Sequence, residues 1–149
     1  MWVSTKAQYG MRALVEVALS GSEAISLKTV AERQLLSHQY LEQIFAVLRR
    51  AGIVESVRGA HGGYRVARPL EEIDTLEVVE LLEGSVAPVS CIVDSANCVR
   101  VGMCSTESLW RRVDAAVRQV LRSTTLADLV QQRRMLGVQP LPQYVGHDD

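Results

Sequence analysis

Three cysteines in the second half of the chain are the residues best suited to hold a metal. Cys91, Cys98 and Cys104 are separated by six and five residues. Thiolates carried by one flexible segment can close around an iron–sulfur cluster. Cys104 also stands just before a predicted helix, whose positive amino-terminal end favours the thiolate form. Three thiolates leave one coordination position open, which would suit a sensor because the weakest ligand is displaced first.

The spacing of the cysteines alone also admits two other uses. A zinc site with three cysteines and one histidine needs an imidazole, and no histidine lies between residues 62 and 146. His38 or His61 would have to reach such a site through the fold. The thiols could instead be unligated, or form a redox pair with one thiol left over. The odd number of cysteines argues against a framework of structural disulfides.

A second group of residues has the spacing of a DNA-reading helix. Ser37 can cap a helix over residues 37–50, which has an apolar inward stripe and polar side chains on the outer face of its opening turns. In helix-turn-helix proteins the opening turns of the second helix meet base edges. Gln39 and Gln43 could pair with adenine, and Glu42 could accept a hydrogen bond from cytosine.

A glycine-rich turn with basic residues follows this helix. The β-prone runs at 53–57 and 64–67 flank the turn and predict a hairpin. Arg58 could enter a narrow minor groove, and the glycines permit a close approach to DNA. The start of the chain could add phosphate contacts. The DNA-contacting residues expected from these features are Ser4, Thr5, Lys6, Ser37, His38, Gln39, Glu42, Gln43, Arg58, Gly59, His61 and Arg65.

Periodicity and capping residues predict the elements that position these groups. Asp74 and Glu77 have the spacing of a capping box, and Thr125 and Asp128 fit the start of a last short helix. Residues 85–104 show no clean periodicity and are predicted to form a loop. The predicted helices cover residues 7–20, 27–34, 37–50, 75–83, 105–122 and 125–134.

The predicted long helix that begins at residue 105 carries an apolar stripe that the amino-terminal half is too small to cover. A helix from a second copy is therefore expected to pack on it. We predict a mainly α fold, a winged helix-turn-helix with a two-stranded wing and a long C-terminal dimerisation helix. The predicted parts are a DNA-binding domain over 1–84, a cysteine-bearing cluster loop over 85–104, a dimerisation helix and final short helix over 105–136, and a flexible tail over 137–149.

Composition and charge agree with a nucleic-acid binder. The chain has 149 residues, of which 48% are hydrophobic, enough for a folded core. The net charge of −1 hides a basic half, +4 over residues 1–70, and an acidic half, −5 over residues 71–149. The sequence shows neither a bilayer-spanning apolar run nor a signal peptide, so we expect a cytoplasmic protein with no membrane partner. No nucleophile–base pair or phosphate loop stands out, so we expect no enzyme activity.

Several motifs follow one another in a fixed order. They are Ser4-Thr5-Lys6, Tyr40-Leu41-Glu42-Gln43, Leu48-Arg49-Arg50-Ala51-Gly52, Ser56-Val57-Arg58-Gly59, Gly62-Gly63-Tyr64 and Thr125-Leu126-Ala127-Asp128-Leu129. In these motifs the chain resembles the family of iron–sulfur winged-helix transcriptional regulators that includes IscR and the nitric-oxide sensor NsrR. The resemblance covers about residues 1–130.

The resemblance implies a homodimer that binds double-stranded DNA at a near-palindromic operator. We expect a repressor that senses redox state or nitric oxide through a cluster held by the three cysteines, with activation, and iron status or cluster supply as the signal, kept as alternatives. The resemblance also implies that Glu42 discriminates between bases, that Arg58 is the wing arginine, and that Tyr40 and Gln43 contact DNA. RNA polymerase or cluster-assembly proteins are further partners that we expect.

Two positions depart from the ligand pattern of the family. Members with a [2Fe–2S] cluster carry a histidine three residues after the third cysteine, where this chain has Glu107. Some [4Fe–4S] members use an acidic residue near the start of helix 1 of the partner subunit, where this chain has Gln8. We take Glu107 as the candidate fourth ligand and favour [2Fe–2S] over [4Fe–4S]. The competing explanation is that Glu107 stabilises the amino terminus of its helix.

Two other functions stay open at this stage. One is a cluster-free winged-helix regulator that is controlled by thiol oxidation or by a partner protein. The other, from a different class, is an iron–sulfur carrier or electron-transfer protein. A carrier would show no sequence-specific, salt-sensitive binding to DNA, so DNA binding separates it from both regulators.

Overall fold

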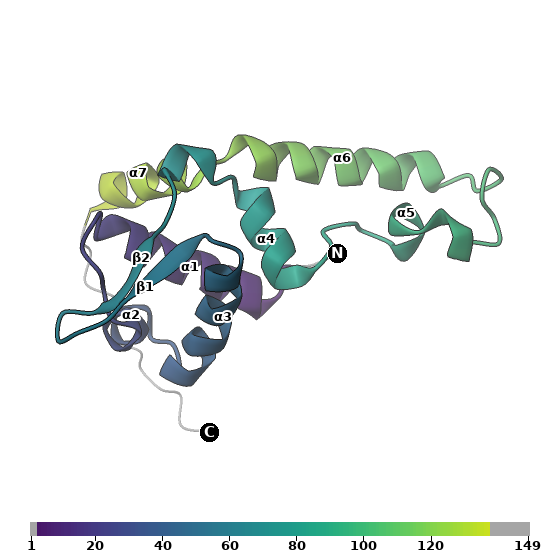
Figure 1. Ribbon diagram of the computed structural model, residues 1–149. Coiled ribbons are helices and arrows are strands. Elements are labelled where there is room, and N and C mark those ends of the chain that lie inside the picture. Colours follow the sequence, from purple (N-terminus) through teal and green to yellow (C-terminus); the bar gives the residue numbers. More distant parts are fainter. Residues whose placement is uncertain (1–2, 138–149) are drawn as a thin grey trace, which may run out of the picture.

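The computed structural model describes residues 3–137 and is mainly helical, with one two-stranded sheet (Figure 1). The helices are α1 (Thr5–Leu19), α2 (Leu27–Gln34), α3 (His38–Arg50), α4 (Thr75–Glu83), α5 (Ser90–Val93), α6 (Glu107–Ser123) and α7 (Leu126–Leu136), the strands are β1 (Val54–Val57) and β2 (Gly63–Val66), and two 3-10 turns, η1 and η2, cover Leu70–Glu72 and Ser95–Asn97. This order confirms the predicted winged helix-turn-helix followed by a long helix. The predicted tail lies outside the described residues after Gly137.

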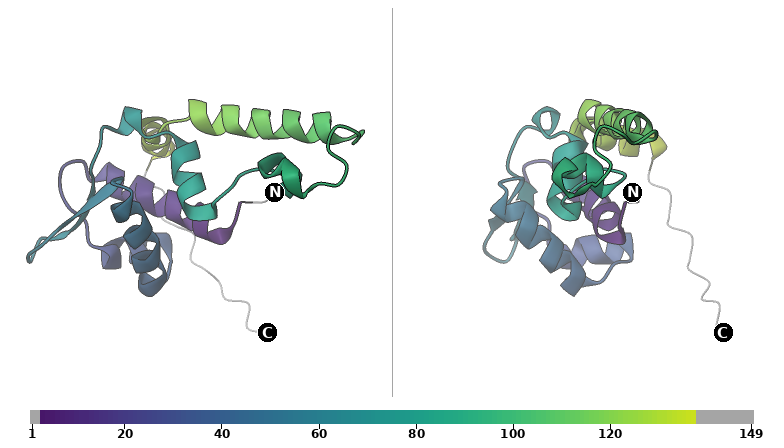
Figure 2. Two further views of the ribbon diagram at one scale, coloured as in Figure 1. Left: turned by 45° about the vertical axis from the view of Figure 1, so that its right-hand side comes forward. Right: turned by 90° about the vertical axis from the view of Figure 1, so that its right-hand side faces the viewer.

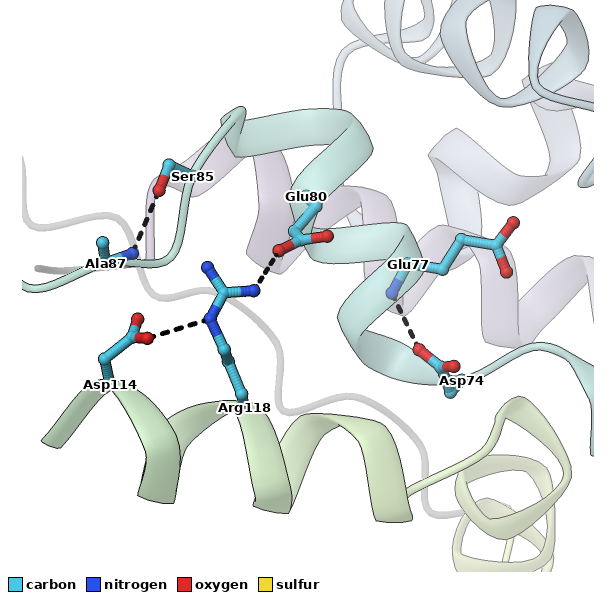
Figure 3. Close-up of polar contacts among 7 residues, drawn as sticks. All are labelled: Asp74, Glu77, Glu80, Ser85, Ala87, Asp114 and Arg118. Carbon is cyan, nitrogen blue, oxygen red and sulfur yellow. Dashed lines mark hydrogen bonds and ion pairs between the residues drawn. The ribbon is translucent and has the colours of Figure 1, made fainter. Parts of the chain in front are cut away.

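The helices begin where the sequence provides capping side chains. Ser37 accepts a hydrogen bond from the Tyr40 amide at 3.2 Å, and Asp74 accepts one from the Glu77 amide at 2.8 Å (Figure 3). Asp74 caps the helix as predicted. The prediction that the Glu77 side chain accepts from the Asp74 amide, which would complete the capping box, is wrong. The Glu77 carboxylate accepts instead from Arg68 at 2.7 Å, because this ion pair with a neighbouring segment competes with the local backbone contact.

One hydrophobic core joins the helix-turn-helix to α1 and α7. Leu14 of α1 and Leu41, Ile44 and Phe45 of α3 are completely buried. This burial holds α3 by its apolar stripe, so the opposite face of α3 is presented outward. Leu35, between α2 and α3, adopts a left-handed conformation with φ +54°.

The hairpin is tied to the helix-turn-helix by a third segment. Strands β1 and β2 pair antiparallel, with Val54 opposite Val66 and Val57 opposite Gly63. Ile25 forms a further antiparallel bridge with Tyr64, in which each amide donates to the other carbonyl at 2.9 and 2.8 Å. Because Ile25 directly precedes the capping residue of α2, this bridge couples the base of the hairpin to the start of α2.

Helix α6 extends from the body of the protein and packs on α4 along one side (Figures 1 and 2). Arg118 of α6 donates to Glu80 of α4 at 2.7 Å and to Asp114 at 3.1 Å (Figure 3). These hydrogen bonds raise the pKa of Arg118 above its ordinary value, with Glu80 as the first cause. Val117 and Leu121 add an apolar contact to the same side of α4.

The segment between α4 and α6, residues 85–106, is called the cysteine loop below. Residues 85–104 of this segment were predicted to form a loop, and this prediction is wrong where the chain forms α5 and η2. These turns are only four and three residues long, too short to produce a periodic pattern in the sequence. Within the described range of 3–137, no helix is both long and apolar enough to cross a membrane.

Candidate nucleic-acid interface and cysteine loop

The outer face of α3 presents the polar side chains that were expected to read bases. His38, Gln39, Glu42 and Gln43 are all exposed on the opening turns of this helix. Ser37 is the capping residue, so its side-chain oxygen serves the helix itself. No other element of the described chain buries these four side chains.

Tyr40 has a different environment from its neighbours on α3. Its side chain is half-buried, and its ring meets the Tyr9 ring of α1 edge-on, with 6.4 Å between the centroids. The Arg12 guanidinium lies over the Tyr9 ring, 5.3 Å from its centroid. Tyr40 therefore joins α3 to α1.

The tip of the hairpin carries the exposed basic residues. Arg58 and His61 are exposed, and Gly59 between them has φ +117°, a conformation that favours glycine. Arg65 is half-buried on β2 and pairs with Glu55 on β1. The pairing leaves less of the Arg65 charge available to DNA than that of Arg58.

The start of α1 lies beside the end of α4, away from the hairpin (Figure 1). Ser4 caps α1 by accepting from the Ala7 amide at 3.3 Å, and the Ser4 amide donates to Glu83 at 2.5 Å. The Ser4 amide and one acceptor site of its hydroxyl are thus used within the chain, while the hydroxyl hydrogen is not. Ser4 and Thr5 are exposed and Lys6 is half-buried.

The three cysteines lie on successive parts of the cysteine loop. Cys91 is in α5, Cys98 follows η2 and Cys104 precedes α6, and all three are half-buried free thiols. In the conformation described for residues 3–137, no three His, Cys, Asp or Glu side chains gather into a group that could hold a metal ion. The donor type suits an iron–sulfur cluster, but the thiols would have to converge to bind one.

Cys104 is the thiol with a distinct electrostatic environment. Its sulfur lies 3.3 Å from the Thr106 hydroxyl, and this hydrogen bond lowers the pKa of Cys104. Backbone amides of Thr106 and Glu107 lower it further, while the Glu107 charge opposes them. The Glu107 carboxylate, the candidate fourth ligand, pairs with Arg111 one helical turn later at 2.8 Å. This is the contact expected of a glutamate in a first helical turn.

The lowered pKa predicts faster alkylation of Cys104 than of an ordinary thiol near neutral pH. The thiolate is the reacting form, so the rate should rise with pH through a lower midpoint. A Thr106→Val variant removes the first cause of the shift and should move this midpoint to higher pH. Mass spectrometry of protein pulsed with iodoacetamide over a pH series measures both midpoints. Identical midpoints in the two proteins would contradict the assigned role of Thr106.

A buried acidic residue in α1 was missed by the sequence reasoning. Glu16 is 5% exposed and accepts from Gln34 Nε2 at 3.0 Å, at the end of α2. It also faces Arg33 at 3.6 Å and Arg133 of α7 at 3.8 Å. The signal in the sequence was an acidic residue between the apolar positions Val15 and Val17. This network ties α7 to the end of the first helix of the helix-turn-helix.

Comparison with known proteins relates this architecture to transcriptional regulators. The Rrf2 family, described as "Iron-dependent Transcriptional regulator", matches residues 3–132. The chain is 41% identical over 131 residues to Protein rrf2 of Nitratidesulfovibrio vulgaris, covering 87% of each chain. It is 42% identical over 135 residues to the HTH-type transcriptional regulator IscR of Cereibacter sphaeroides, also covering 87% of each.

A solved structure shares the fold as well. The structure of CymR, the global cysteine regulator of B. subtilis, superposes with a TM-score of 0.76 at 38% identity, covering 89% of this chain and 98% of that one. At this identity and coverage, the similarity extends over both the winged helix-turn-helix and the long helix. The relatives therefore include one named as a cysteine regulator as well as one named IscR.

Proposed function

Because this chain belongs to the Rrf2 family of DNA-binding transcriptional regulators, we propose that it binds operator DNA as a homodimer and that an iron–sulfur cluster on the cysteine loop adjusts this binding. The observation that carries the proposal is the position of three free thiols on the segment that joins α4 to α6. A group bound there would act on the connection between the DNA-binding half and the long helix.

The unpaired face of α6 supports the homodimer. Val117 and Leu121 face α4, but Leu109 and Val120 are 46% and 64% exposed although they belong to an apolar stripe. Ala116 lies between these two residues on the same stripe and is also exposed. A second copy of α6 is the partner that matches this stripe in length and character, since a two-fold axis pairs identical surfaces.

In this proposal α3 enters the major groove and the hairpin lies beside it. The exposed amides and carboxylate of α3 would meet base edges, and Arg58 would enter the minor groove. Thr5 and Lys6 would contact phosphates. Two such units in a homodimer would read a near-palindromic operator, because the symmetry of the protein is repeated in the site.

An Arg58→Ala variant is expected to bind operators at least about fivefold more weakly, with a smaller dependence of affinity on salt, because an exposed cation is lost at the hairpin tip. Fluorescence anisotropy at several salt concentrations measures both effects. Arg134→Ala, which removes an exposed arginine from α7, is the matched control and should bind normally. Equal losses in the two variants would show that only total charge matters.

Cys91, Cys98 and Cys104 would hold the cluster, and Glu107 is the candidate for its fourth position. The cluster would supply an inorganic centre that changes on oxidation or on reaction with nitric oxide, with [2Fe–2S] favoured over [4Fe–4S]. The cysteine loop is anchored at one end by α4 and at the other by α6, and Arg118 joins these two helices. Ordering of the loop would set the angle between the two DNA-binding units.

Anaerobic purification with iron and sulfide analysis tests this proposal. We expect brown protein with sulfur-to-metal absorption bands, a dimeric mass in solution, and operator affinity or sequence preference that differs between the cluster-bound and apo forms. Equal affinities of both forms across a set of operators would refute regulation by the cluster. A monomer that binds no promoter sequence would refute the proposal as a whole.

A cluster-free regulator controlled by thiol oxidation is the second candidate. The contact between Cys104 and Thr106 favours it, because a stabilised thiolate is the form that oxidants attack. The similarity to CymR, named a cysteine regulator, is compatible with it. Colourless anaerobic protein whose DNA affinity falls on mild oxidation and recovers on reduction would establish this candidate over the cluster.

A further inference from the structure

Two exposed side chains of α3 face each other at the start of the helix. His38 Nε2 lies 3.6 Å from Glu42 Oε1, and the side chains are 52% and 61% exposed. A small rotation of either side chain would bring these atoms to hydrogen-bond distance. The pair lies on the outer face of α3, away from Leu41 and Ile44, which are buried.

The stability of α3 does not account for this pair. A histidine at the first residue of a helix with a glutamate one turn later is the reverse of the order that the helix dipole favours. Exposed pairs of this kind contribute little to folding. The arrangement is therefore better explained by what the two side chains do at the outer face of the helix.

A carboxylate on a DNA-reading helix has a particular electrostatic difficulty. Glu42 would approach a duplex whose phosphates repel it, and it gains a favourable contact only when its oxygen accepts from a base amino group such as that of cytosine. A long, exposed glutamate has several rotamers, and only some of them aim at one base. A donor on the preceding turn limits these rotamers and offsets part of the negative charge.

We propose that His38 is a specificity-determining positioning residue, which holds one carboxylate oxygen of Glu42 so that the other is directed at a base. This inference rests on the proposed DNA-reading role of α3. His38 acts in it through Glu42, so the two residues should influence the same base pair of the operator. It differs from a direct contact of His38 with DNA, which would affect a separate position.

Selection of randomised operators followed by sequencing provides the test, with the full-length dimeric protein. Wild type, Glu42→Ala, His38→Leu and the double variant are compared, and the change caused by Glu42→Ala identifies the base pair that Glu42 reads. We expect His38→Leu to reduce the preference at that same base pair about threefold or more. The double variant should match Glu42→Ala alone, because His38 has no role once Glu42 is absent.

Two further variants separate positioning from other effects. His38→Gln keeps a side-chain N–H donor and should retain most of the preference. Glu32→Gln changes an exposed carboxylate on α2, outside the pair and outside the proposed DNA contacts, and should leave the preference at the Glu42 base pair intact. Thermal unfolding of each variant shows whether α3 is intact, and the base preference, a ratio within one protein, is not altered by a change in the amount folded.

The outcomes distinguish this inference from the function on which it rests. If wild type selects an operator but His38→Leu keeps its preference, or changes a different base pair, or adds to the effect of Glu42→Ala, the positioning role is wrong and the DNA-binding function stands. If wild type selects no sequence at all, the DNA-reading role of α3 is wrong, and the positioning role proposed for His38 is wrong as well.

Discussion

A Gly63→Ala variant is expected to lose about 2–4 kcal/mol of folding stability and most of its operator affinity. Gly63 begins β2 with φ +150°, and a Cβ placed there would lie 2.1 Å from the carbonyl oxygen of Ile25 and 2.6 Å from the Ser26 amide nitrogen. These are backbone atoms, so no side-chain rotation relieves the overlap. The two hydrogen bonds between Ile25 and Tyr64 would have to break, and the hairpin would separate from the start of α2.

Gly59→Ala is the matched control for this prediction. Gly59 also has a positive φ of +117°, but a Cβ there meets no atom within 4 Å. Its cost should be limited to the strained backbone conformation, about 1–2 kcal/mol. Urea denaturation of both variants gives the two free energies of unfolding. If Gly63→Ala is as stable as Gly59→Ala, the bridge to Ile25 does not hold the hairpin in place.

A Cys104→Ser variant purified without air is expected to be colourless and to contain almost no iron, because the cluster proposed for the cysteine loop would lose one of its three thiolates. Serine has nearly the size of cysteine, but its hydroxyl is a poor ligand for iron in clusters. Cys104 is the informative choice, since its thiolate is the one stabilised by Thr106. Absorption spectra and iron and sulfide analysis measure the loss, and operator selection shows whether the variant behaves like the apo protein.

Two variants of neighbouring residues test whether the loss of the cluster is specific to Cys104. Ser105→Ala removes an exposed hydroxyl next to Cys104 and should keep the full cluster content. Glu107→Ala should keep the cluster but shorten its lifetime in air if Glu107 is the fourth ligand, whereas an unchanged spectrum and lifetime would eliminate Glu107. Retention of colour and iron by Cys104→Ser would contradict the assignment of Cys104 as a ligand.

The helices of the DNA-binding half were predictable because their signals are local. The predicted bounds of α2 and α4 coincide with those in the structure, where Ser26 caps α2 and Asp74 caps α4. A capping oxygen and the amide it accepts from are three residues apart, so the interaction is encoded in one short stretch. The same is true of the capping box that begins α7 at Thr125 and Asp128.

The predictions that failed depended on distant residues or on very short elements. The Glu77 carboxylate was expected to accept from an amide at the start of its own helix. It accepts instead from Arg68, which lies in a preceding segment. The turns α5 and η2 were missed because four and three residues cannot show a helical period. Glu16 was missed because its partners in α2 and α7 are far from it in the sequence.

The sequence by itself determined the types and order of the functional groups: a capped helix with a polar outer face, a glycine-rich basic turn and three thiols on one segment. Only the tertiary structure decided which surfaces remain available. It covered one side of α6 with α4 and left Leu109 and Val120 exposed, and within residues 3–137 it did not gather the three thiols into one metal-binding group. Caps and periodicity act over a few residues, whereas the covering of a surface depends on segments such as those of Glu80 and Arg118, which only folding brings together.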